Sequence, residues 1–164
     1  MITGTITAQD YLSAMRLHRR SSVRRQMVWL TVFVVAGTVI AAFGHLLPGC
    51  VLLGAGVGGM VGELVQSKFV LPRRTRRIHG QQASMRDTYE YSWDDDSLTV
   101  SSRNARVERR WKDYLKMLEN DELLLLYQSD VMFEMFPKSW FQSEAQARQF
   151  RALASECGGP GHGP

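Results

Sequence analysis

Cysteine and histidine are scarce in this 164-residue sequence, and their placement excludes several kinds of site. The two cysteines, Cys50 and Cys157, are 107 positions apart, which fits neither a disulfide framework nor the spacing of metal ligands. All four histidines lie outside residues 81–156, so a serine or carboxylate in that segment has no evident histidine partner for acid–base chemistry. We therefore predict no catalytic residue, no metal site and no cofactor, and we expect a protein that is not an enzyme.

Charged residues are missing from two long apolar runs. Residues 27–47 and 49–62 contain no Asp, Glu, Lys or Arg. A hydrocarbon core of about 30 Å needs about 20 helical residues, and the first run has that length. We predict a transmembrane helical hairpin over 27–71, with spans at 27–47 and 50–71 and a turn at Pro48 and Gly49. The 26-residue leader and the length of the apolar run disfavour a cleaved signal peptide.

Basic residues flank this hairpin and are absent from its turn. The net charge is +8 over residues 1–79 and −4 over residues 80–164, so the excess of positive charge is local and does not favour nucleic acid. The positive-inside rule places both termini in the cytoplasm, in a multi-pass protein of the bacterial inner membrane. Eight arginines are candidate contacts for anionic lipid headgroups: Arg19, Arg20, Arg24, Arg25, Arg73, Arg74, Arg76 and Arg77.

The second run contains the letters of a dinucleotide-binding turn, with glycines at 54, 56 and 59. That fold needs an acidic residue about 20 positions later, and none lies between Glu63 and Asp87. Small residues four positions apart instead predict close packing of a helix against another backbone, either the first span or a second copy of the chain. The residues of this predicted packing face are Gly54, Ala55, Gly58, Gly59 and Gly62.

Glu63 is the one carboxylate within the apolar region. An ionisable group in a membrane helix is costly and calls for an explanation. We expect Glu63 to reach the membrane interface or to pair with an arginine, and proton or ion coupling is the alternative.

Alternating polar and apolar residues follow the hairpin. This pattern predicts strands at 88–93, from Leu98, and at 106–111, 114–119, 123–128 and 131–136, followed by a helix that begins near Ser143. The predicted fold is an α+β membrane protein, with the hairpin followed by a small antiparallel sheet or barrel and a C-terminal helix. The predicted segments are a basic amphipathic leader at 1–26, the hairpin at 27–71, a basic linker at 72–80, the cytoplasmic domain at 81–156 and a flexible tail at 157–164.

Several short motifs appear in a familiar order along the chain. They are "TYEYSWDDDSLTV" from Thr88, Trp111, "LLLLY" from Leu123 and "MFPKSWF" from Met135. In this order, after two spans, they resemble the bacterial YcxB-like membrane protein family. The resemblance implies a C-terminal domain similar to the pleckstrin-homology (PH) fold and implies no firm activity.

Two functions follow as hypotheses. The first is a membrane-anchored interaction or regulatory module that binds a protein, a peptide or a lipid headgroup at the inner leaflet. The second is a small oligomeric transporter, channel or ion-coupled regulator that uses Glu63. Expected partners are membrane lipids and either an unknown protein or a second copy of the chain.

Overall fold

The computed structural model describes residues 1–81, 87–103 and 105–155 and divides them into two compact units. One unit contains residues 18–74, and the other contains residues 1–17 together with the described residues from 75 onward. The predicted tail at 157–164, with Cys157, lies outside the described residues.

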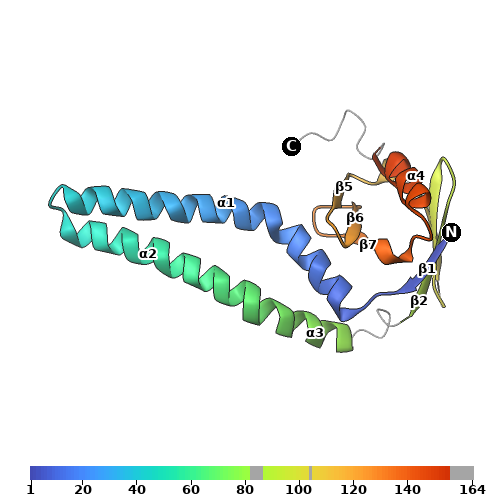
Figure 1. Ribbon diagram of the computed structural model, residues 1–164, viewed down its shortest axis with the longest axis horizontal. Helices are drawn as coiled ribbons and strands as arrows, with labels where there is room; N and C mark the ends of the chain where they lie inside the picture. The colour runs from blue at the N-terminus through green and yellow to red at the C-terminus, as the bar shows by residue number, and fades with distance from the viewer. Residues whose placement is uncertain (82–86, 104, 156–164) are drawn as a thin grey trace. The chain divides into compact units, whose positions relative to one another are not determined.

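The first unit is built on an antiparallel pair of long helices (Figure 1). Helix α1 spans Ala8–Ala42 and begins in the other unit, and α2 spans Leu46–Val65. The chain reverses at residues 43–45, where Gly44 has a φ of 90°, and not at Pro48 and Gly49 as predicted. Pro48 instead occupies the first turn of α2, where backbone N–H groups have no partner within the helix and a proline is tolerated.

The predicted linker at 72–80 is helical. The π-helix η1 (Gln66–Val70) continues α2, and α3 (Leu71–Gln81) follows without a break. In regular α geometry the ring of Pro72 would clash with the carbonyl group of Lys68, and the wider π turn just before it relieves that clash. Pro72 therefore does not interrupt the helix, and the predicted linker continues it.

The outward faces of α1 and α2 are apolar and uncovered. Trp29 is 60% exposed, Val35 is 57% exposed and Leu47 is 84% exposed. In the most apolar 18-residue window of each long helix, only 6% and 17% of the residues are buried. The core helix of a soluble protein would be mostly buried, so this exposure indicates membrane association. Both helices are long and apolar enough to cross a membrane, as predicted.

The second unit contains two antiparallel sheets and a C-terminal helix. The four-stranded sheet has the order β1 (Ile2–Thr5), β2 (Thr88–Trp93), β3 (Ser97–Ser101), β4 (Arg106–Arg110). The three-stranded sheet has the order β5 (Lys116–Glu119), β6 (Leu123–Tyr127), β7 (Phe133–Pro137). Short 3₁₀ turns lie at Trp111–Asp113 (η3) and Lys138–Trp140 (η4), and helix α4 spans Glu144–Ser155.

Strand β1 is the main departure from the predicted organisation. Residues 2–5 belong to the sheet and not to the predicted leader, since Ile2 pairs with Tyr91 and is 2% exposed. Gly4 allows the indole of Trp140 to lie against the strand, because a Cβ atom there would be 2.0 Å from Trp140 Cε2. A four-residue strand whose partner lies more than 80 positions away leaves no local periodicity to detect.

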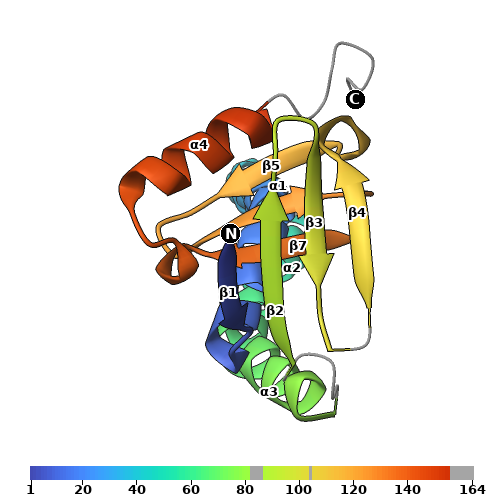
Figure 2. The same cartoon turned by 90° about the vertical axis from the view of Figure 1, so that its right-hand side faces the viewer.

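The two sheets cross and enclose an aromatic core (Figure 2). Tyr91 and Leu98 from one sheet meet Leu124 and Phe136 from the other, and Phe150 of α4 closes one end. The opposite face of β6 packs against a second cluster that includes Ala14 and Leu17 at the start of α1. Strand β6 is therefore buried on both faces, which explains its uninterrupted apolar run. The described strands form no closed barrel.

Hydrogen bonds from backbone N–H groups to nearby side chains fix a turn and a helix start in this unit. The Asp94 carboxylate accepts hydrogen bonds from the N–H groups of Asp96 and Ser97, at 2.9 and 2.7 Å, and closes the β2–β3 hairpin. These backbone donors hold the pKa of the Asp94 carboxyl below its usual value. Ser143 Oγ caps α4 by accepting from the N–H of Gln146 at 3.2 Å, as the predicted capping signal requires.

Candidate functional site

The seam between α1 and α2 is formed by glycines of α2 at a seven-residue spacing. A Cβ atom on Gly49 would lie 2.7 Å from Ala41 Cβ, and one on Gly56 would lie 2.6 Å from Val34 Cγ2. Glu63, seven positions further, is 4% exposed on the same face. Seven-residue spacing keeps side chains on the seam of two packed helices. We call Gly49, Gly56, Gly59 and Glu63 the hairpin seam.

The predicted packing face only partly coincides with this seam. Gly59 belongs to it, since a Cβ atom there would lie 2.5 Å from Leu30 Cδ2. Gly54, Gly58 and Gly62 have no neighbouring atom within 4 Å of such a Cβ, and Ala55 is exposed. The first span is therefore not the packing partner of these four residues. Small residues at four-residue spacing occur on α2, but the contacts with α1 lie at Gly49, Gly56 and Glu63, seven residues apart, and at Gly59.

Glu63 ends the hairpin seam in an ion pair with Arg19. The Nη2 atom of Arg19 lies 3.2 Å from Oε1 and 3.4 Å from Oε2 of Glu63. The Glu63 side chain is 3% exposed, whereas that of Arg19 is 27% exposed. The pair neutralises a carboxylate that would be costly to leave alone inside an apolar hairpin. Pairing with an arginine is one of the two arrangements expected for Glu63.

The other seven arginines proposed as lipid contacts are exposed. Arg20, Arg24 and Arg25 lie on α1, and Arg73, Arg74, Arg76 and Arg77 lie on α3. None of them forms an ion pair within the described part of the chain. They are thus available to phosphate groups, while Arg19 is engaged by Glu63.

In the sheet unit, β4 is the open edge of the four-stranded sheet. It pairs with β3 on one side and has no strand on the other among the described residues (Figure 2). Val107, at its centre, is 41% exposed. The strand at the other end, β1, has Trp140 packed against its face at Gly4. An uncovered edge offers unpaired N–H and C=O groups to another extended chain.

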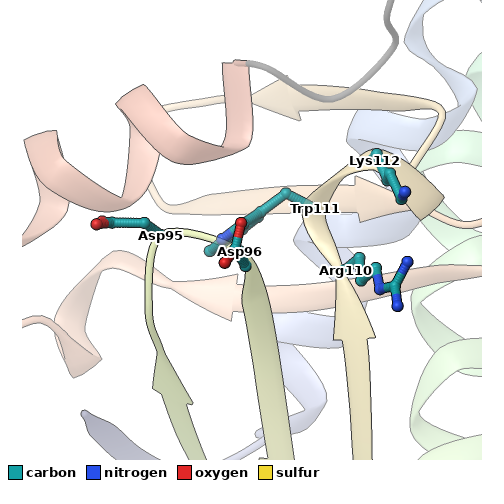
Figure 3. A pocket seen from close by; sticks show the side chains of 5 residues that line it. All are labelled: Asp95, Asp96, Arg110, Trp111 and Lys112. Carbon is teal, nitrogen blue, oxygen red and sulfur yellow. The ribbon is translucent and has the colours of Figure 1, made fainter.

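A shallow pocket of about 420 Å³ lies at the end of β4, lined by Asp95, Asp96, Arg110, Trp111 and Lys112 (Figure 3). The Trp111 indole N–H donates to the carbonyl oxygen of Asp94 at 2.9 Å, which fixes the pocket wall. Arg110 points away from both aspartates (Figure 3) and forms no ion pair with any described carboxylate. The residues that line the pocket carry both positive and negative charges, so the pocket selects neither cations nor anions. The Arg110 guanidinium lies free beside the β4 edge.

Glu134 is the buried carboxylate of this unit. It accepts hydrogen bonds from the Tyr114 hydroxyl at 2.9 Å and from the Gln128 amide, and its Oε1 lies 3.6 Å from Nε of Arg109. Burial raises the pKa of the Glu134 carboxyl, although these three partners act in the opposite direction. The inward-pointing Arg109 of β4 is thereby tied to β7, and the cluster links the two sheets.

Metal-binding chemistry has no support in the described residues. No three His, Cys, Asp or Glu side chains come together there. Of the three consecutive aspartates, Asp94 closes a turn through its backbone contacts.

The functional residues that the sequence reasoning overlooked are Arg19 as the partner of Glu63, Gly49 and Gly56 in the seam, and the edge strand β4. A search for seven-residue spacing would have found Gly49, Gly56 and Glu63. No comparable signal marks β4 as an edge, because its position depends on strand order.

The strands and helix from the end of β2 to α4 form the part of the chain that matches a family model. Residues 93–154 match the family model described as YcxB-like protein. The resemblance predicted from the sequence is confirmed over this segment. No curated protein and no solved structure matches the chain. The YcxB-like match covers most of the sheet unit and leaves out the hairpin seam.

Proposed function

We propose that the chain is a membrane-anchored interaction module whose YcxB-like, PH-like sheet unit binds a partner protein at the inner leaflet. The helical hairpin is the anchor, in a bacterial inner membrane, with both termini in the cytoplasm. The distribution of arginines supports this orientation, because they flank α1 and α2 and are absent from the connecting turn.

The open edge of β4 is the observation that carries the proposal. Strand β4 has five residues, mostly exposed side chains and one unpaired side. Natural sheets usually cover or blunt such edges. A partner that adds an extended segment to β4 satisfies its backbone groups, which is a recurring mode of peptide recognition.

A photo-crosslinking amino acid at position 107 tests this proposal in native membranes. Val107 lies at the middle of β4, and Arg148 on the exposed face of α4 is the matched control position. We expect a protein adduct from position 107 and none from position 148, with the cross-link mapped by mass spectrometry to an extended segment of the partner. Adducts with lipid alone, or equal yields from both positions, would rule out β4 as the binding edge.

Ion coupling through Glu63 is the second candidate function. Its support is a nearly buried carboxylate in a membrane helix. The Arg19 contact favours an anchoring role instead, because a carboxylate held by a guanidinium already has a structural purpose. Glu63→Gln distinguishes the two: unchanged phenotype and unchanged assembly would eliminate ion coupling.

A further inference from the structure

We infer that the segment recognised by β4 is extended and acidic, with carboxylates four positions apart and a non-acidic residue midway between them. This inference rests on the proposed function and specifies its partner. The side chains of β4 provide the chemistry.

Alternate residues of β4 point to opposite faces of the sheet. Arg106, Glu108 and Arg110 share the outer face, where their cross-strand partners are Ser101, Thr99 and Ser97. Val107 and Arg109 share the inner face. The outer face of the edge thus carries two cations separated by one carboxylate.

The two outer cations have no partner of their own. Neither Arg106 nor Arg110 forms an ion pair with a carboxylate in the described ranges, and both are exposed. Glu108, in contrast, accepts a hydrogen bond from Ser97 Oγ at 3.2 Å. The free charge along the edge is therefore positive.

An antiparallel strand added to β4 places one residue directly opposite each residue of the edge, with Cβ atoms about 4.5–5.5 Å apart. Opposite Arg106 and Arg110 the complementary residue is Glu or Asp. Opposite Glu108 a carboxylate would be repelled, so a neutral or basic residue fits there. Because these positions alternate in the added strand, the two carboxylates are four residues apart.

The same charges disfavour a second copy of the chain as the occupant. The antiparallel register that pairs all of β4 with itself sets Arg106 opposite Arg110 and Glu108 opposite Glu108. Like charges directly opposite one another destabilise a strand pair.

Binding of short peptides to the full chain in lipid nanodiscs tests the inference. The probe is a fluorescein-labelled peptide, Thr-Glu-Val-Thr-Val-Glu-Thr, measured by fluorescence anisotropy. The control is Thr-Val-Glu-Thr-Glu-Val-Thr, which has the same composition and charge. With two-residue spacing, no register can bring both of its glutamates opposite Arg106 and Arg110.

The control can still bring one glutamate opposite one arginine, so the two peptides differ by one ion pair. We expect the probe to bind about 1.4-fold to fivefold more tightly than the control, since each exposed ion pair contributes about 0.2–1 kcal/mol. The double variant Arg106→Glu/Arg110→Glu should abolish this difference, while Arg148→Glu should leave it unchanged. Circular dichroism and thermal unfolding of each variant establish that the sheet unit remains folded.

The outcomes separate this inference from the proposed function. Equal binding of both peptides, sensitive to substitutions in β4, refutes the spacing and retains β4 as a docking edge. Binding of neither peptide, together with a protein adduct at position 107, refutes the acidic segment alone. Binding of neither peptide and no adduct refutes both. A concentration-dependent dimer cross-linked through position 107 identifies a second copy as the occupant and overturns the inference.

Discussion

Gly56 and Gly58 form a matched pair for testing the hairpin seam. Both are interior glycines of α2, two positions apart, but only Gly56 faces α1. A Cβ atom at position 56 would lie 2.6 Å from Val34 Cγ2 and 2.9 Å from the carbonyl oxygen of Leu30. At position 58 it would meet nothing within 4 Å. We predict that Gly56→Ala destabilises the hairpin and that Gly58→Ala does not.

The size of the effect follows from these distances. The methyl group at position 56 must move by about 0.6 Å or more to reach ordinary van der Waals separation from the Leu30 oxygen. That atom belongs to the backbone and cannot rotate away. Overpacking of this kind typically costs about 1–3 kcal/mol. Gly58→Ala should lie between no change and a stabilisation of about 1 kcal/mol, because alanine favours a helix more than glycine does.

Reversible unfolding in mixed micelles with an increasing fraction of SDS, followed by circular dichroism, measures both variants. The result that would refute the reasoning is a free energy of unfolding for Gly56→Ala equal to that of the original chain, or an equal loss for both variants. A change in oligomeric state for Gly58→Ala alone would show that the exposed glycines contact a second copy.

Three further predictions concern the ion pair, the buried carboxylate and the aromatic core. Arg19→Ala should lower the free energy of unfolding by about 3–5 kcal/mol in the same assay, because it leaves a buried carboxylate without a partner. Glu63→Ala should cost less, since Arg19 is partly exposed and can turn to solvent, and equal losses would contradict this asymmetry. The pKa of Glu134 is raised by burial, so the stability of the sheet unit should fall as the pH rises through that pKa. Glu134→Gln should flatten this dependence in thermal melts, and the same pH dependence in the variant and the original chain would contradict the prediction. Phe150→Ala should cost about 3–5 kcal/mol in the same melts, while Arg148→Ala on the exposed face of α4 should change little, and comparable losses would show that α4 does not close the core.

The sequence predicted the elements that local patterns specify. Two charge-free runs identified the two long apolar helices, alternation identified β2 to β7, and Ser143 identified the start of α4. In each case the signal lies within one window of the chain. The turns at Asp94 and Asn120 are local in the same sense, because their side chains accept hydrogen bonds from backbone N–H groups two or three positions later.

The features that the sequence did not reveal depend on contacts between distant segments. The ion pair joins residues 19 and 63, and any of the arginines before the first span could have been chosen from the sequence. Of the predicted packing face only Gly59 contacts α1, and Gly49 and Gly56 were not predicted because four-residue spacing was considered and seven-residue spacing was not. Which strand forms an open edge depends on the order of all the strands, and in that order β4 pairs with β3 alone.

Strand β1 also changes how the anchor and the sheet unit are connected. The chain passes from β1 to α1 through two residues, Ile6 and Thr7. A reciprocal cap fixes the start of the helix. The N–H of Asp10 donates to Thr7 Oγ1 at 3.1 Å, and the N–H of Thr7 donates to Asp10 Oδ2 at 2.9 Å. The sheet is therefore continuous in sequence with the first membrane helix through β1, and a fragment that begins at residue 81 would expose the edge of β2. Because Ile2 lies in the same core cluster as Tyr91 and Phe150, removing the leader would damage the core as well as the edge. The β4 edge is for this reason best tested in the full chain.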